Sequence, residues 1–174
     1  SGEVMLYNLT KHGNRKVIFI LGKGQLLNQS IVSKKPNALF CEAVCPVKVI
    51  EIAEEQFLQL MEQSHALTRA VLREYERNLW RMGHQLKNTT GNMQMERKIA
   101  AKLWKLGRDF GVDTEDGVMI DIDLTITLMA DLVGAPRENV SRACKVLTDR
   151  GLIRYGNKRF ILTDSDGLAE FYKM

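Results

Sequence analysis

The feature that most constrains the fold is a short break, Gly134-Ala135-Pro136, between two segments whose apolar residues recur at helical spacing. The two segments are residues 124–133 and 137–150. Gly134 permits a tight turn because it has no Cβ, Ala130 lets two helices cross closely, and Val140 is apolar where the second helix must pack inward. The pattern predicts a helix–turn–helix, and the alternative is a pair of core helices joined by a short turn.

The segments on either side extend this unit. We expect a helix over residues 95–110, a strand over 117–122, and two short strands over 152–154 and 159–162. The last two strands flank Tyr155-Gly156-Asn157-Lys158, which is typical of a turn. The order helix, strand, helix–turn–helix, hairpin is that of a winged helix.

Residues 1–52 follow a period of two, which is typical of strands. Strands are expected over 4–9 and 16–21, and a third extended stretch over 39–52 is broken at Pro46. Glycine-bearing turns join these segments, so the pattern favours a small barrel or sandwich.

The period changes to that of a helix at residue 53. A short helix is expected over 53–62, followed by a long helix that begins at the N-cap Ser64 and ends near 88–91. At about 24 residues and 1.5 Å each, the long helix would span roughly 36 Å. We interpret Thr89-Thr90-Gly91-Asn92 as a hinge.

One narrow apolar stripe on the long helix repeats at spacings of three and four residues, as in a two-stranded coiled coil. Charged residues flank the stripe on both sides. We therefore predict a dimer helix, and the alternative is a helix that lies on its own core. The predicted interface residues are Leu72, Tyr75, Leu79, Met82 and Leu86.

Charge is distributed unevenly along the chain. The formal net charge is +4, yet residues 134–160 alone hold seven Lys or Arg against only Glu138 and Asp149. The acidic residues collect elsewhere, chiefly over 113–123. A segregated basic patch is the expected footprint of a phosphate-binding surface, and the alternative is a solvated basic face.

The second helix of the helix–turn–helix gathers polar residues on one side and near its start, the end that enters a DNA major groove. Arg142 can fork onto guanine O6 and N7, and Glu138 can accept a hydrogen bond from cytosine N4. A plain ion pair between Glu138 and Arg142, four residues apart, is the alternative. Lys158 and Arg159 at the hairpin tip suit phosphate contacts. The predicted DNA-binding set is Arg137, Glu138, Ser141, Arg142, Lys145, Thr125, Thr127, Lys158 and Arg159.

Residues 125–153, which end in Val-Gly-Ala-Pro-Arg-Glu-Asn-Val-Ser-Arg-Ala-Cys-Lys-Val-Leu-Thr-Asp-Arg-Gly-Leu-Ile, resemble the DNA-binding domain of CRP/FNR-type transcription regulators. This is the family of the cyclic AMP receptor protein and the fumarate–nitrate reduction regulator. The upstream order is also similar: Ser-Gly-Glu-Val-Met-Leu-Tyr, then Ile-Leu-Gly-Lys-Gly, a strand ending Val-Ile-Glu-Ile, and the long helix. The resemblance covers the whole chain.

The resemblance implies an α+β fold in three parts. Residues 1–62 would be the C-terminal part of a β-roll (a cupin-like jelly roll) that senses an effector, 63–91 the dimerisation helix and hinge, and 92–174 the winged helix-turn-helix. It further implies a bacterial, cytoplasmic homodimer that binds double-stranded DNA, contacts RNA polymerase and responds to a small-molecule effector.

The resemblance also assigns roles in base reading. Glu138, Ser141 and Arg142 fall on the Glu-x-x-Ser-Arg pattern of the FNR-like branch, which implies an inverted repeat with half-sites resembling TTGAT or TTGAC. Arg137 also occurs in the cyclic AMP receptor branch, where Gly stands in place of Ser141.

Two departures from the family matter. The match begins at an internal strand of the β-roll, so we expect the chain to be a truncated piece, and iron–sulfur cysteines near the family's N-terminus would not be seen. In the family's cyclic-nucleotide cassette a Gly-Glu pair and an Arg-Ser pair hold ribose and phosphate. Here Gln29 replaces the acid and no Arg-Ser is present over 27–38. Cyclic AMP is therefore not expected as the ligand.

The remaining candidate residues give no sign of catalysis or metal binding. Cys41 and Cys45, about 13 Å apart along a strand, are expected to be small core residues rather than a thiol sensor, and Cys144 to pack inward. An odd number of cysteines argues against a disulfide framework. His12, His65 and His84 are scattered, and each is expected to be a surface or helix residue rather than a ligand. No enzyme motif, metal site or cofactor is predicted.

Neither a signal peptide nor a membrane-spanning segment is predicted from the sequence. The first residues lack a basic segment followed by an apolar one, and no run of about 18 apolar residues could span a membrane. A reducing cytoplasm is the expected compartment. The alternative function is a ligand-sensing or partner-binding module whose winged helix does not read DNA.

Overall fold

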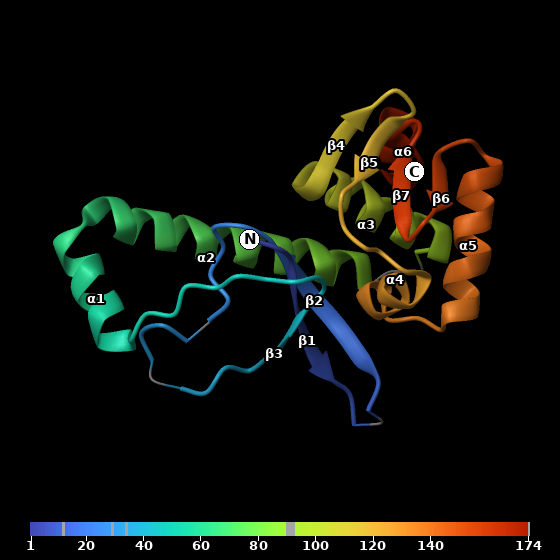
Figure 1. The fold of residues 1–174 in the computed structure, drawn as a ribbon. Coiled ribbons are helices and arrows are strands. Elements are labelled where there is room, and N and C mark those ends of the chain that lie inside the picture. The colour runs from blue at the N-terminus through green and yellow to red at the C-terminus, as the bar shows by residue number, and fades with distance from the viewer. Residues whose placement is uncertain (12, 29, 34, 90–92, 174) are drawn as a thin grey trace. The chain divides into compact units, whose positions relative to one another are not determined.

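The computed structural model describes residues 1–11, 13–28, 30–33, 35–89 and 93–173. The chain divides into two compact units (Figure 1). One comprises residues 1–8 and 19–91, and the other comprises 9–18 and 92–174. Of the predicted hinge at 89–92, only Thr89 is among the described residues, as the last residue of a helix.

A three-stranded sheet in the order β2-β1-β3 begins the chain. Its strands are β1 (Val4–Leu9), β2 (Arg15–Leu21) and β3 (Phe40–Ala43). β1 and β3 are antiparallel, with Val4 opposite Ala43 and Tyr7 opposite Phe40, and the last two rings stack at 5.5 Å. The first two predicted strands are confirmed. They form where β-branched and aromatic side chains, such as Val17 and Phe19, can be buried.

The prediction for residues 39–52 is largely wrong. Only β3 forms there, all four of its residues are exposed, and the chain from 44 to 53 has no regular structure. Pro46 explains the break because it has no N–H to continue a ladder. Cys41 is consequently exposed rather than in the core, and Cys45 is only partly buried. Cys144 does pack inward as predicted, and burial raises the pKa of its thiol to about 11.

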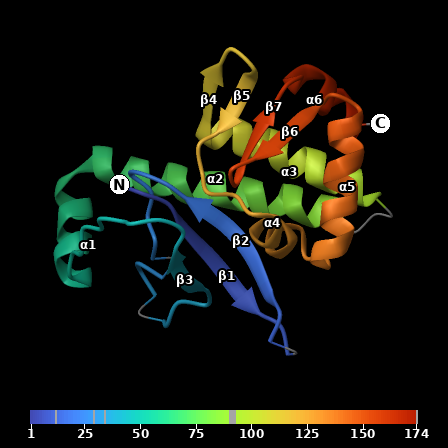
Figure 2. The same ribbon diagram turned by 45° about the vertical axis from the view of Figure 1, so that its right-hand side comes forward.

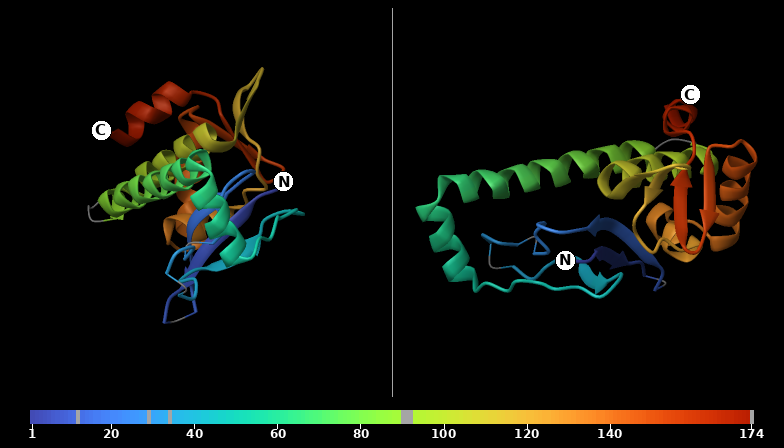
Figure 3. Two further views of the ribbon diagram at one scale, coloured as in Figure 1. Left: turned by 90° about the vertical axis from the view of Figure 1, so that its left-hand side faces the viewer. Right: turned by 45° about the horizontal axis from the view of Figure 1, so that its top comes forward.

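Two helices follow, α1 (Glu54–Gln63) and α2 (His65–Thr89), with a sharp bend between them that Figure 3 shows clearly. Ser64 is the predicted N-cap, and its Oγ accepts a hydrogen bond from the Leu67 N–H at 3.2 Å. The Thr68 hydroxyl donates to the Met61 carbonyl across the bend at 2.5 Å. On α2, Val71 is buried, whereas four of the five stripe residues are exposed.

The second unit surrounds a four-stranded sheet in the order β4-β5-β7-β6, seen side by side in Figure 2. The strands are β4 (Gly111–Thr114), β5 (Gly117–Ile120), β6 (Ile153–Gly156) and β7 (Arg159–Leu162). The helices are α3 (Met95–Phe110), α4 (Ile126–Val133), α5 (Arg137–Asp149) and α6 (Ser165–Lys173). α3 packs against both α5 and α6, so its buried residues Ile99 and Leu103 lie at the centre of the core.

The predicted winged-helix order is observed, with two additions that the sequence pattern missed. β4 has a single apolar residue, Val112, and all four of its residues are exposed, so it has no alternation to detect. α6 is short and begins with Ser165-Asp166-Gly167, which reads as a turn. The β6–β7 hairpin closes through Asn157 and Lys158, whose φ values of 49° and 60° suit a tight two-residue turn.

Replacing Leu147 by Ala is expected to destabilise the second unit by about 2–5 kcal/mol, because it leaves a cavity beneath α5. Leu147 is 0% exposed. Urea unfolding followed by far-UV circular dichroism and tryptophan fluorescence would measure the change. The neighbouring Val146→Ala is the matched control, since Val146 is 37% exposed. An equal loss in the two variants would contradict this account of the core.

Candidate nucleic-acid interface

The N-terminus of α4 is fixed by Thr125, whose Oγ1 accepts a hydrogen bond from the Leu128 N–H at 3.0 Å. Thr125 belongs to the predicted DNA-binding set, and this contact shows that it is also a helix cap. Its hydroxyl hydrogen can still be donated to a phosphate oxygen. Thr127, on the first turn of α4, is exposed.

The turn between α4 and α5 follows the predicted chemistry. Gly134 has a left-handed φ of 70°, and its N–H donates to the Ala130 carbonyl at 2.8 Å. An L side chain rarely adopts that conformation, which explains the glycine. Pro136 is the N-cap of α5, and its carbonyl accepts from the Val140 N–H at 3.2 Å. The direction of α5 is therefore set within three residues of the end of α4.

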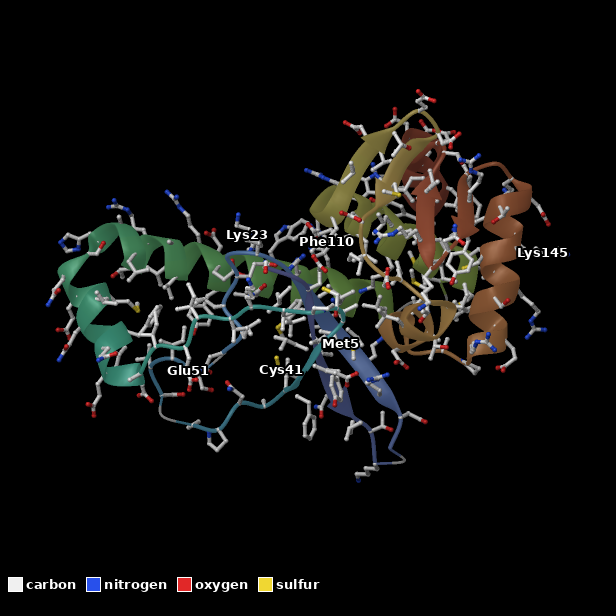
Figure 4. All side chains as sticks on the ribbon, viewed as in Figure 1. Met5, Lys23, Cys41, Glu51, Phe110 and Lys145 are labelled. Atoms are coloured by element: carbon white, nitrogen blue, oxygen red, sulfur yellow. The ribbon has the colours of Figure 1, made fainter. Side chains whose placement is uncertain are left out.

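α5 presents one apolar face and one polar face. Val140, Ala143 and Leu147 are buried at 0–1% exposure, so the helix can bury them only by turning the opposite side outward. Every predicted reading residue on α5 is exposed, and Figure 4 shows Lys145 pointing away from the helix. An open hollow of about 480 Å³ is lined by Arg137, Glu138, Ser141 and Arg142.

Arg142 is paired with Asn139 and not with Glu138. Its Nη2 donates to the Asn139 Oδ1, one turn earlier on the same helix. No ion pair between Glu138 and Arg142 is found among the described residues. An amide carries no charge, so this contact orients the guanidinium without neutralising it. The Glu138 carboxylate therefore lies beside Arg142 as a separate acceptor.

The wing holds the two other predicted residues in different surroundings. Lys158 is exposed at the hairpin tip, and its carbonyl accepts from the Leu124 N–H at 2.7 Å. The Arg159 guanidinium forms ion pairs with Asp121 and, at 3.5 Å, with Asp123. Sequence reasoning noted those acids but missed that the β5–β7 pairing would bring them beside Arg159. Lys158 is thus the better placed of the two for phosphate.

In the described part of the chain, no group of three or more His, Cys, Asp or Glu side chains could hold a metal ion. None of the helices described is both long enough and apolar enough to cross a membrane.

Comparison with known families matches both ends of the chain. Residues 97–171 match the family model of the Crp-like helix-turn-helix domain, and residues 1–64 match that of the cyclic nucleotide-binding domain. The first match contains α4, α5 and the wing, and therefore all nine predicted DNA-binding residues.

Individual relatives have low sequence identity to this chain, but the alignments cover most of its length. A CRP-like cAMP-activated global transcriptional regulator from Mycobacterium tuberculosis is 25% identical over 170 residues, covering 97% of this chain and 75% of that protein. A global nitrogen regulator from Nostoc sp. is 24% identical over 161 residues, covering 91% of this chain and 72% of that protein.

Solved structures share the fold. A CRP/FNR-family transcriptional regulator from Thermus thermophilus has a TM-score of 0.78 at 20% identity, covering all of this chain and 85% of its own. A CooA mutant from Carboxydothermus hydrogenoformans has a TM-score of 0.79 at 18% identity, covering 99% of this chain and 76% of its own. The predicted fold class, a β-rich domain followed by a C-terminal winged helix-turn-helix, is confirmed. The chain belongs to the CRP/FNR family, which consists of transcription regulators and not of enzymes.

Proposed function

We propose that this regulator binds an inverted-repeat DNA operator as a homodimer, under the control of a small-molecule effector. The observation that carries the proposal is the polar face at the start of α5, exposed opposite the buried Val140, Ala143 and Leu147. The opposite side of the helix is buried in the core. An exposed helix face with charged donors and acceptors can contact base edges in a DNA major groove. The match to the Crp-like helix-turn-helix domain supports the same role.

The residues divide into readers and phosphate ligands. Arg142 would donate to guanine and Glu138 accept from cytosine, with Ser141 between them, on half-sites resembling TTGAT or TTGAC. Cationic or hydroxyl side chains at the edges would bind phosphate, which adds affinity without sequence information. This second group is Arg137, Lys145, Thr125, Thr127, Lys158 and Arg159.

The exposed stripe on α2 would form the dimer. Leu72, Leu79, Met82 and Leu86 are 47–72% exposed in the single chain. Apolar side chains in such a row gain about 25 cal/mol for each Å² of surface removed from water. A second copy of α2 would supply that burial and would place two copies of α5 on two half-sites. Contact with RNA polymerase is part of the family resemblance, and we assign no residues to it.

The effector would enter through the unit that matches the cyclic nucleotide-binding domain. Activation by cyclic AMP is a property of the mycobacterial relative. Residues 27–38 of this chain lack the Gly-Glu and Arg-Ser pairs that hold the ribose and phosphate in the family pattern. We therefore propose an effector other than cyclic AMP.

Binding of the full chain to a labelled duplex is expected to be stronger for a TTGAT-type inverted repeat than for a scrambled duplex. Affinity for both duplexes should fall steeply between about 50 and 200 mM salt, because phosphate binding releases counterions. Fluorescence anisotropy would measure both dissociation constants, and added cyclic AMP should change neither. Equal affinity for the two duplexes would refute base reading by α5. Failure to bind either at low salt would favour the partner-binding alternative.

Replacing Arg142 by Ala is expected to cost about 1–3 kcal/mol in affinity for the inverted repeat and to relax preference over the scrambled duplex. Arg150→Ala is the matched control. It removes the same charge from the other end of α5, where the guanidinium lies 5.0 Å from the Phe171 ring centre. The same anisotropy titrations apply. An Arg142→Ala variant with undiminished preference would remove Arg142 from the reading set.

Replacing Leu79 by Gln is expected to shift the chain toward monomer, because Leu79 is 72% exposed at the centre of the α2 stripe. Sedimentation velocity over a range of concentrations would give the dimer dissociation constant. Arg73→Gln, an exposed position on another face of α2, should leave the constant unchanged. A dimer that tolerates Leu79→Gln would refute this interface.

A further inference from the structure

One hairpin contributes to both compact units. The base of β1 and the end of β2 belong to the first unit, whereas residues 9–18, which include the hairpin loop and the start of β2, belong to the second. The strands are labelled in Figure 2. The second unit is otherwise made of residues 92–174. Residues 9–18 are therefore held by contacts with residues of the 92–174 segment.

The first contact of the tip is an ion pair. Arg15 Nε donates to Asp131 Oδ2 at 3.0 Å, and the two side chains are 33% and 19% exposed. The residues are 116 positions apart in sequence. Because both groups are largely shielded from water, their attraction is screened less than that of an exposed pair.

The second contact is one residue along. Lys16 Nζ donates to the Leu132 carbonyl at 3.1 Å. Leu132 lies in the last turn of α4, where carbonyls have no partner within the helix and the helix dipole is negative. Burial, followed by the charge of Lys98, lowers the pKa of Lys16. The ammonium group is thus drawn from water to cap α4.

Both contacts lie next to the turn between α4 and α5. A Cβ added to Gly134 would lie 2.9 Å from Lys16 Nζ, so the hairpin rests against the turn that sets the direction of α5. Neither Arg15, Lys16 nor Asp131 belongs to the proposed DNA-reading set. Their contribution to DNA binding would be made through the helix–turn–helix and not by touching DNA.

We propose that Arg15 and Lys16 are positioning residues: they clamp the β1–β2 hairpin to the C-terminal end of α4 and so fix the turn that aims α5. Residues 9–18, which carry Arg15 and Lys16, belong to the same compact unit as α4 and α5. The inference rests on the proposed function for its effect on DNA, but the clamp itself can be tested without DNA.

The first test is a charge swap in the full chain. Arg15→Glu and Asp131→Arg should each speed amide hydrogen exchange at Gly134 and Ala135 about tenfold, because the N–H groups there bond to Ala130 at the end of α4. The double variant, which restores opposite charges, should return exchange toward the wild-type rate. Lys11→Glu makes the same charge change at an exposed position on the same hairpin and should have no effect.

The second test separates positioning from simple stability. Arg15→Glu should weaken binding to the inverted-repeat duplex about fivefold or more, as an allosteric coupling of ordinary size would, and the double variant should recover it. Lys16→Met should act in the same direction, and Lys16→Arg, which keeps a donor for the Leu132 carbonyl, should restore binding.

The outcomes are distinct. Unchanged exchange in both single variants, or no recovery in the double variant, would overturn the clamp. Faster exchange with unchanged operator affinity would overturn the positioning role. Loss of all far-UV circular dichroism in Asp131→Arg would leave Arg15→Glu and Lys16→Met to decide. If exchange behaves as expected but wild-type protein shows no preference for the inverted repeat, the proposed function fails and the clamp stands.

Discussion

The burial of one face of α5 is the constraint on which the rest of the second unit depends. Val140, Ala143 and Leu147 are almost completely removed from water, and α3 provides the surface that covers α5. A helix repeats every 3.6 residues, so fixing this stripe in the core also fixes which residues face out. The candidate reading face is exposed as a direct result.

Local polar contacts then decide how the exposed charges are oriented. Arg142 is oriented by the neutral amide of Asn139, so its charge is kept, and Glu138 is kept apart from it as an acceptor. On the wing, Arg159 shares its charge with Asp121 and Asp123. Two arginines from one basic segment are thus placed in opposite electrostatic conditions. Counting charges along a sequence cannot separate such cases, because the partners come from other elements.

The C-terminal end of α4 must satisfy several structural requirements at once. Its last carbonyls need partners, the chain must reverse within three residues, and α5 must leave in one direction. Gly134 meets the conformational demand with a left-handed φ, and Lys16 meets part of the hydrogen-bonding demand. A hairpin that supplies the missing donor becomes mechanically attached to the turn. In a regulator, attachment at this point is more consequential than attachment to a distant surface helix.

The sequence by itself determined the first two strands, both helices around Ser64, the helix–turn–helix and the exposed set on α5, because each depends on local periodicity or on caps and turns a few residues long. The tertiary structure alone decided the rest. It left Cys41 exposed on an edge strand, added β4 and α6, paired Arg159 with an acid 38 residues away, and brought Arg15 to Asp131. These outcomes depend on contacts between residues far apart in sequence, and no local pattern encodes which distant side chain will complete them.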